Sequence, residues 1–567
     1  MNDIFAAKDR GCDLIYKKKL IEHFPYDNYR RYQEKAIEAI YNAFEVKGFN
    51  HVLLESPCGS GKSANAVTIA RYYGDAYLLT SQTVLQNQYM RDYGCPGKFS
   101  DIMGRRNYYC AVMENCTCDD GFCSGGKCPD PTECPYIIAK EDAASSEIAL
   151  MNYTYFLFAT KHSQTFFPRK LIIYDEAHSI DKVLMGFVEI KIKSRGIQRF
   201  GDISRIPRFD KASEYIPWLI EISKCLKDEM KDNQVIYKQI LSENSSHDGK
   251  LSVNDVIKSV RRKIENSEKR INKIEEYAKR FDVDKWVTKV YEGRTQDDDE
   301  VVFKPISVAP YSQECFFNYG EKHLYMSATL LDKSNFCRNI GIDEKDAHMI
   351  RVPSTFPPEN RKIFFINTGS MSYKEKRDTL PKISADVNKI MNLYPDKKGM
   401  IYTVNWEIYD HIFSTISTKN RRRLLGHKNG DRNTALYEFI KMKSPRVLIT
   451  PSLSEGIDLK DDRARFLIVV KMPYPNMSDP QVKAKKDVDQ DWFRYQTVLT
   501  LIQVCGRGVR SPEDWCDIYI LDSCFNQIRN PGWPGYRPPN FFTDDFIAGL
   551  NEGDKHINKI EGYNLHE

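Results

Sequence analysis

The sequence predicts an α/β protein with two blocks of parallel β-sheet covered by helices. Short apolar runs alternate with helix-forming stretches toward both ends of the chain, which is typical of parallel sheets with helical crossovers. A glycine-rich loop follows one such run in the first block. Seven of the 15 cysteines fall between Cys95 and Cys134, and a charged helical stretch follows them, so two inserts are expected to interrupt the first block.

Length and composition bound the class of protein. The chain has 567 residues, which at roughly 150 residues per domain suggests three or four domains. The net charge of +5 indicates no global attraction for nucleic acid and leaves a local basic patch open. No apolar run approaches the ~18–20 residues of a membrane span, and the N-terminus has no apolar signal segment. We therefore expect no membrane contact and a cytoplasmic protein, in the host cytoplasm if it is viral.

The first block is expected to be discontinuous, and the second continuous. The predicted divisions are 1–95, 141–189 and 301–335 for the first block, 96–140 for the cysteine-rich insert, 190–300 for the helical insert and 336–567 for the second block. Apolar residues between Ile257 and Ala278 recur at three- and four-residue steps, which predicts an amphipathic helix. We expect its apolar stripe to pack on another helix rather than to bind DNA.

Each block contains short apolar segments that we predict to be strands. In the first block they are His51–Glu55 and Lys170–Tyr174, and the segment Ser63–Tyr73 between them is a predicted helix. In the second block the predicted strands are Gly399–Val404, Arg446–Thr450 and Phe466–Lys471.

The loop after His51–Glu55 has the composition of a phosphate-binding loop. It consists of Ser56, Pro57, Cys58, Gly59, Ser60, Gly61, Lys62 and Ser63, and it opens a helix, as such loops do. The glycines let backbone N–H groups turn into one concavity, and the helix N-terminus adds partial positive charge. We expect Lys62 to reach the β- and γ-phosphates of ATP and Ser63 to ligate Mg²⁺. Ser56 replaces the first glycine of the strict pattern, and an ordinary glycine-rich turn is the alternative.

A second predicted strand, Lys170–Tyr174, runs directly into the sequence Asp-Glu-Ala-His. A carboxylate at the end of a strand beside a phosphate-binding loop can hold Mg²⁺ through water, and its neighbour can accept a proton from the attacking water. We assign the first role to Asp175 and the second to Glu176. His178 is expected to sense the γ-phosphate. A solvated acidic loop is the alternative.

The second block contributes Gln503, Arg507 and Arg510. The two arginines are three residues apart, so on a helix they would share a face. Guanidinium groups that reach across a cleft can neutralise charge on a phosphoryl group in transfer. The alternative is a salt-bridged surface helix.

The cysteine-rich segment has little hydrophobic periodicity and cannot form a core of its own. An odd number of cysteines and the expected intracellular location argue against a disulfide framework and favour a metal or iron–sulfur site. A Cys₄ zinc site fits the same composition, and buried free thiols are the third possibility. Beside it, Arg105, Arg106, Tyr108 and Tyr109 are candidates for contact with single-stranded DNA or for packing around the metal.

Taken in order, these motifs resemble those of superfamily-two helicases, specifically the XPD/DinG-like iron–sulfur branch. The resemblance pairs Ser56–Ser63 with motif I, Leu79–Thr83 with motif Ia, Asp175–His178 with motif II, Ser327–Leu330 with motif III, Ser454–Asp458 with motif V and Gln503–Arg510 with motif VI. It implies two RecA-like motor domains, an iron–sulfur insert and a helical arch-like insert. It also implies that Gln33 contacts adenine and that Asp458 belongs to the nucleotide site. The short arch hints at a phage-type member.

The branch assignment rests on the cysteines. Cys110 resembles the first cluster ligand of the family, and the spacing of Cys123, Cys128 and Cys134 resembles that of DinG. The resemblance therefore implies a [4Fe–4S] cluster on these four thiolates. Cys116 or Cys118 in place of Cys123 stays open, as does zinc in place of the cluster.

These predictions converge on an ATP-dependent DNA helicase that uses ATP, Mg²⁺ and a [4Fe–4S] cluster. The family implies 5′-to-3′ movement, single-stranded and forked DNA as substrates, replication or repair proteins as further partners, and a monomer. Two alternatives stay open: a DNA-stimulated ATPase that remodels protein–DNA complexes without unwinding, and a zinc-containing DNA-binding protein with an inactive phosphate loop.

Overall fold

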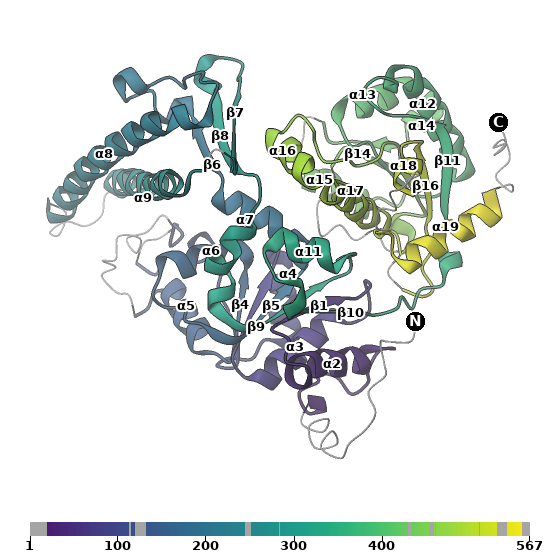
Figure 1. The fold of residues 1–567 in the computed structure, drawn as a ribbon, viewed down its shortest axis with the longest axis horizontal. Coiled ribbons are helices and arrows are strands. Elements are labelled where there is room, and N and C mark those ends of the chain that lie inside the picture. The colour runs from purple at the N-terminus through teal and green to yellow at the C-terminus, as the bar shows by residue number, and fades with distance from the viewer. Residues whose placement is uncertain are drawn as a thin grey trace.

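A computed structural model of the chain describes residues 20–112, 115–119, 132–243, 251–282, 284–428, 432–452, 459, 461–509, 511–529 and 541–557. Within them the fold is α/β, as predicted, with two parallel sheets and a third, antiparallel one (Figure 1). Among the described helices, none combines the length and apolar character that a membrane span requires.

The first of the two domains that the resemblance identifies as motor domains is built on a seven-stranded parallel sheet, in the order β10-β1-β9-β5-β2-β4-β3. Its strands are β1 (His51–Glu55), β2 (Ala76–Thr80), β3 (Phe99–Asp101), β4 (Ile148–Asn152), β5 (Arg169–Asp175), β9 (Gly320–Ser327) and β10 (Ala347–Arg351). Its helices are α2 (Gln33–Tyr41), α3 (Lys62–Tyr73), α4 (Thr83–Tyr93), α5 (Pro135–Ser145), α6 (Tyr153–His162), α7 (Ile180–Val188), α10 (Ser312–Cys315) and α11 (Lys333–Ile340).

The side chains of β1 point alternately to the two faces of this sheet, and helices cover both faces. Leu53 packs with residues of α6 and α7 on one face, whereas Val52 and Leu54 pack with residues of α2 and α3 on the other. All three side chains are fully buried. Successive residues of a strand point to opposite faces, so an unbroken apolar run such as this one needs a helical layer on each side.

The first domain extends beyond the predicted boundary at residue 335. Strand β10, Ala347–Arg351, pairs in parallel with β1, so it belongs to the first sheet although we placed it in the second block. The sequence offers no sign of this, because a strand at the end of a sheet has the same composition whichever sheet accepts it.

The second motor domain has a six-stranded parallel sheet in the order β11-β16-β15-β12-β14-β13. Its strands are β11 (Ile363–Gly369), β12 (Gly399–Tyr402), β13 (Leu424–Leu425), β14 (Val447–Thr450), β15 (Phe466–Val469) and β16 (Asp517–Asp522). Its helices are α12 (Lys376–Leu393), α13 (Trp406–Thr415), α14 (Thr418–Arg421), α15 (Arg432–Lys441), α16 (Pro480–Val488), α17 (Gln490–Cys505), α18 (Phe525–Arg529) and α19 (Asp544–His556).

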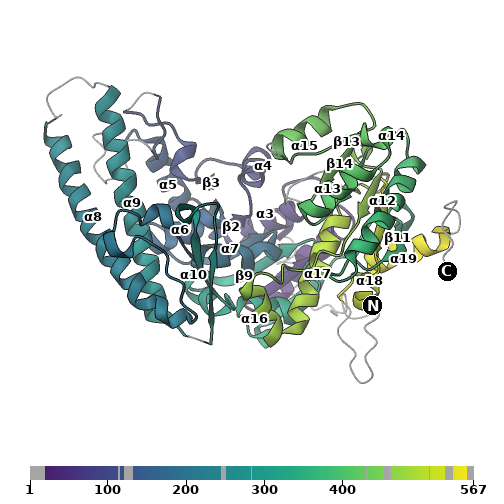
Figure 2. The ribbon, with the colours of Figure 1, turned by 90° about the horizontal axis from the view of Figure 1, so that it is seen from above.

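The insert between α7 and α10 is only partly helical. Two long helices, α8 (Tyr215–Glu243) and α9 (Leu251–Arg280), pack side by side and project from one side of the molecule, opposite the second motor domain (Figure 2). At their base lies an antiparallel sheet of β6 (Ile190–Lys193), β8 (Glu300–Pro305) and β7 (Trp286–Tyr291). The amphipathic stripe predicts α9 correctly, and its apolar side contacts α8 as expected, but the small sheet was not predicted.

Candidate active site

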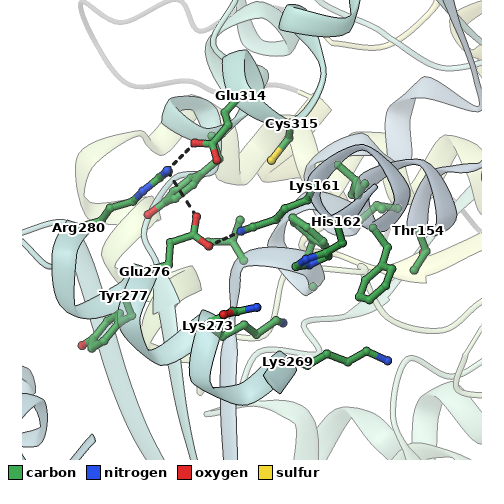
Figure 3. A pocket seen from close by; sticks show the side chains of 18 of the residues that line it. Thr154, Lys161, His162, Lys269, Lys273, Glu276, Tyr277, Arg280, Glu314 and Cys315 are labelled. Atoms are coloured by element: carbon green, nitrogen blue, oxygen red, sulfur yellow. Dashed lines mark hydrogen bonds and ion pairs between the residues drawn. The ribbon is translucent and has the colours of Figure 1, made fainter. Parts of the chain in front are cut away.

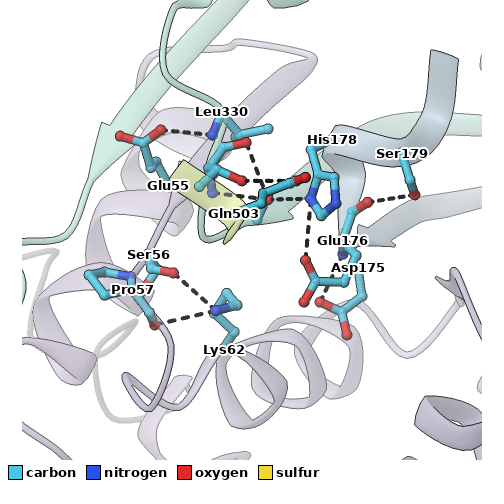
Figure 4. Close-up of polar contacts among 12 residues, drawn as sticks. Glu55, Ser56, Pro57, Lys62, Asp175, Glu176, His178, Ser179, Leu330 and Gln503 are labelled. Carbon is cyan, nitrogen blue, oxygen red and sulfur yellow. Dashed lines mark hydrogen bonds and ion pairs between the residues drawn. The ribbon is translucent and has the colours of Figure 1, made fainter. Parts of the chain in front are cut away.

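The predicted phosphate-binding loop joins β1 to α3. Gly59 and Gly61 have φ values of 78° and 89°, a backbone conformation that residues with a Cβ rarely adopt. The Lys62 ammonium donates hydrogen bonds to the carbonyl oxygens of Ser56 at 3.0 Å and Pro57 at 3.3 Å, so it lies over the concavity of its own loop (Figure 4). The loop therefore has the shape, and the cation at its mouth, that a bound polyphosphate needs.

Gln33, the first residue of α2, is buried against this loop. Its Nε2 donates to the Gly61 carbonyl oxygen at 3.0 Å, and its Oε1 accepts from the backbone N–H of Arg30 at 3.0 Å. A Cβ at Gly61 would lie 2.2 Å from that Nε2, so a larger residue there would displace the Gln33 amide in addition to straining the backbone. The contact couples the predicted adenine residue to the phosphate loop.

Asp175 ends β5, where the carboxyl edge of the sheet also carries the phosphate loop. The side chain is buried, and burial, followed by the neighbouring Glu176 charge, raises the pKa of Asp175 to about 6, while Lys62 opposes the rise. The Tyr89 hydroxyl donates to its Oδ2 at 3.0 Å, and the Tyr153 hydroxyl donates to its backbone carbonyl at 2.8 Å. Because burial makes the charged form of this carboxylate unfavourable, a divalent cation beside it would stabilise that charge.

Two tyrosines are thus functional contacts that sequence reasoning missed. Tyr89 is fully buried on α4, and Ser63 of the phosphate loop approaches the same hydroxyl that holds Asp175. It therefore connects the two side chains that we predicted to hold Mg²⁺. The sequence signal was weak, because Tyr89 is one of several apolar and aromatic residues in a helix that also has polar ones.

A chain of polar contacts connects Glu176 to the second motor domain. Glu176 adopts a left-handed backbone conformation with φ 55°, and its carboxylate lies 3.3 Å from Nδ1 of His178. The same nitrogen lies 2.8 Å from the Ser327 hydroxyl at the end of β9, and that hydroxyl accepts from the backbone N–H of Thr329 at 3.1 Å. Gln503 of α17 then donates to the Thr329 hydroxyl at 3.3 Å. Motifs II, III and VI are therefore in contact (Figure 4).

Glu55, a residue that the sequence analysis left unassigned, fixes the segment after β9. Its Oε2 accepts from the backbone N–H groups of Leu330, at 2.7 Å, and Leu331. Burial raises the pKa of Glu55, which these two donors and the nearby Arg351 oppose. The signal in the sequence was a carboxylate at the end of an otherwise apolar strand.

The structure places Arg507 beyond the end of a helix, whereas the prediction that it shares a helical face with Arg510 stays a prediction. Helix α17 ends at Cys505, and Gly506 and Gly508 follow. A Cβ at Gly508 would lie 2.4 Å from Sγ of Cys516, so the close packing of these two residues leaves no room for a larger side chain at position 508. Arg507 lies in the turn after α17, whereas Arg510 and Asp458 lie outside the described residues.

The described cysteines of the first insert gather in its interior. Cys110, Cys116, Cys118 and Cys134 are all buried, and the backbone N–H of Cys110 donates to the carbonyl oxygen of Cys116. Sγ of Cys118 lies 3.9 Å from Sγ of Cys134, and burial together with the Cys134 charge raises the pKa of Cys118 to about 12. Cys123 and Cys128 lie outside the described residues, and no complete set of metal ligands occurs within the described ones.

The basic and aromatic residues beside these cysteines divide into two groups. Arg105 lies 3.7 Å from Glu265 of α9 and over the Tyr136 ring, and Tyr108 accepts from the backbone N–H of Met103, so both have structural partners. Arg106 lies 3.7 Å from Asp119, and Tyr109 is 77% exposed.

These features define a protein with two RecA-like motor domains. Each domain has a parallel sheet, the first sheet carries the phosphate loop and an acidic strand end, and Gln503 of the second domain reaches across to the first. A family model described as a helicase C-terminal domain matches residues 388–532, and one described as the res subunit of type III restriction enzymes matches residues 27–197. The predicted resemblance to the XPD/DinG-like branch of superfamily-two helicases is confirmed by the relatives below.

A probable ATP-dependent helicase of Methanocaldococcus jannaschii is 20% identical over 96% of this chain and 99% of its own length. The ATP-dependent DNA helicase XPD of Sulfolobus acidocaldarius is 26% identical over 28% of this chain and 30% of its own length. A solved XPD helicase structure has a TM-score of 0.60 at 18% identity and covers 89% of this chain and 97% of that one. That likeness shows the shared fold.

Proposed function

We propose that the protein is an ATP-dependent DNA helicase that moves 5′ to 3′ along single-stranded DNA. The observation that carries the proposal is the continuous set of contacts from Glu176 through His178, Ser327 and Thr329 to Gln503. When hydrogen bonds connect a phosphate site to the second motor domain, a change at the γ-phosphate can cause relative movement of the two domains.

The proposed chemistry uses residues of both domains. Lys62 would leave its carbonyl contacts for the β- and γ-phosphates of ATP. Ser63 and Asp175 would hold Mg²⁺, which would supply positive charge beside those phosphates. Glu176 accepts a proton from the attacking water. Arg507, and with it Arg510, approaches the transferring phosphoryl group from the second domain. Through its hydrogen bond to Thr329, Gln503 couples the phosphate site to the second domain.

We also propose that a [4Fe–4S] cluster is held by Cys110, Cys123, Cys128 and Cys134. The burial of the described thiols, in a segment with almost no apolar core, supports a metal group as its main support. The short separation of Cys118 from Cys134 favours Cys118 as the replacement ligand if Cys123 is not one. A cluster there would brace the insert rather than take part in ATP hydrolysis.

The test combines ATP hydrolysis with strand displacement on forked DNA. We expect hydrolysis that single-stranded DNA stimulates, displacement of a duplex that follows a 5′ tail, and loss of both activities in Lys62→Ala. Stimulated hydrolysis without displacement would instead support a remodelling ATPase. Displacement only from a 3′ tail would contradict the direction, and no hydrolysis by the unaltered protein would contradict the proposal as a whole.

A further inference from the structure

A pocket of about 520 Å³ lies where the helical insert meets the first motor domain (Figure 3). Helices α6 and α7 form one wall, α9 forms another, and α10 contributes Glu314 and Cys315. The volume is within the range of pockets that hold small organic ligands. The proposed ATP and cluster sites do not use any of its lining residues.

The charges of this pocket are predominantly positive. Five lysines and arginines line it against two glutamates: Lys161, Lys182, Lys269, Lys273 and Arg280, with Glu276 and Glu314. Both glutamates are already engaged, because Glu276 pairs with Lys161 and Arg280, and Glu314 pairs with Arg280 (Figure 3).

Among the described residues, the lining glutamates form no ion pair with Lys182, Lys269 or Lys273. Lys273 donates to the backbone carbonyl of Glu189 at 3.1 Å, and Lys269 lies over an aromatic ring. Lys182 is exposed at the rim. The pocket therefore has a surplus of positive charge that an anionic group of a ligand would offset.

The wall formed by α6 is aromatic. Phe158 is 41% exposed, and Phe187 of α7 lines the same pocket. The Lys269 ammonium lies 5.0 Å from the centre of the Phe158 ring. The centre of the His162 ring lies 4.6 Å from that of Phe158, so a base that stacks on Phe158 would take the place of the Lys269 ammonium, which could then hold the phosphate. A partly exposed aromatic ring beside a cation is the pairing that single-stranded nucleic-acid sites use.

We propose that this pocket binds one nucleotide unit, its base stacked on Phe158 and its phosphate held by Lys269, with Lys182 and Lys273 nearby. The inference rests on the proposed function when the nucleotide is an unstacked residue of the bound strand; a free mononucleotide has the same chemistry. Helix α6 also contacts the cysteine-rich insert, since the hydroxyls of Tyr155 and Tyr136 lie 3.0 Å apart.

The experiment measures binding of a fluorescein-labelled oligothymidylate to the full chain by anisotropy over a series of salt concentrations. We expect Phe158→Ala to raise Kd about tenfold with little change in salt dependence, because it removes stacking only. Lys269→Ala should lower the slope of log K against log salt by about 0.7, as expected for one lost phosphate contact to a single strand. Two matched controls should bind as the unaltered protein does: Phe167→Ala, exposed in the same domain, and Lys263→Ala, exposed on the same helix.

A second measurement separates the two sources of the nucleotide. Thymidine monophosphate is titrated calorimetrically into the protein with excess Mg·ADP present to occupy the phosphate loop. Binding that Phe158→Ala weakens would support the pocket with a free nucleotide as occupant, whereas an effect on the oligonucleotide alone would support a residue of the strand.

Wild-type affinity and salt slope in both variants, with no Phe158-dependent mononucleotide binding, would overturn the inference. If the unaltered protein bound no oligonucleotide, the proposed helicase function would fail, and the mononucleotide titration would still decide the pocket.

Discussion

Replacing Asp175 by asparagine tests whether the free protein carries electrostatic strain at its phosphate site. The carboxyl is buried at the end of β5 beside Glu176, and its pKa is raised from 3.8 to about 6. Each pH unit between the folded and unfolded pKa corresponds to about 1.4 kcal/mol, so the charged side chain destabilises the fold by about 3 kcal/mol above pH 6.

Asparagine removes that cost but cannot keep both hydrogen bonds of the carboxylate. The Tyr89 hydroxyl donates to Oδ2 and the backbone N–H of Glu176 donates to Oδ1, whereas an amide has a single acceptor oxygen. The lost hydrogen bond costs about 1 kcal/mol. We therefore expect Asp175→Asn to stabilise the metal-free protein by about 2 kcal/mol while it abolishes Mg²⁺-dependent ATP hydrolysis.

The pH dependence of the stability difference distinguishes this electrostatic effect from a change in packing, which would not depend on pH. A folded pKa above the unfolded one means that the contribution of Asp175 to stability is retained below pH 3.8 and is lost as the pH rises toward 6. The stability difference between variant and wild type should therefore grow between about pH 4 and 6 and stay constant above, where only the charged form is present.

The assay is urea denaturation in the presence of EDTA at a series of pH values, followed by far-ultraviolet circular dichroism. Asp522→Asn is the matched control, because Asp522 is equally buried at the end of β16 but accepts from three backbone N–H groups, those of Met371, Met472 and Cys524. That variant should be destabilised. A destabilised Asp175→Asn, or a difference independent of pH, would refute the electrostatic argument.

Three further changes test the other contacts. Gln503→Ala should leave ATP binding intact but reduce DNA-stimulated hydrolysis by about two- to tenfold, the effect of one neutral hydrogen bond across the domain interface, and unchanged stimulation would argue against this route of coupling. Glu176→Gln should bind ATP and hydrolyse it at least a hundredfold more slowly, measured by single-turnover release of phosphate; wild-type turnover would remove Glu176 as the base. Cys134→Ser should lose the iron found in anaerobically purified protein, and Cys118→Ser separates the two ligand sets: retained iron supports Cys123, lost iron supports Cys118.

Local sequence was enough to predict the elements that are determined by residues adjacent along the chain. His51–Glu55 forms a strand with those bounds because an unbroken apolar run suits a strand buried on both faces. The phosphate loop followed from its glycines, and α9 from its apolar period. In each case the residues that determine the structure are neighbours along the chain.

Other features depend on partners far away in sequence. Packing between distant segments decides which sheet accepts β10, the close approach of Gly508 to Cys516, and the small sheet at the base of α8 and α9. The same holds for the site: its lysine, its carboxylates and its motifs were visible in the sequence, but the buried Tyr89 that joins Ser63 to Asp175, and the path from His178 to Gln503, exist only once β1, β5 and β9 lie side by side. Sequence determines which groups are present, and tertiary structure determines which are close enough to interact, because hydrogen bonds and charge interactions in a protein act over only a few ångströms.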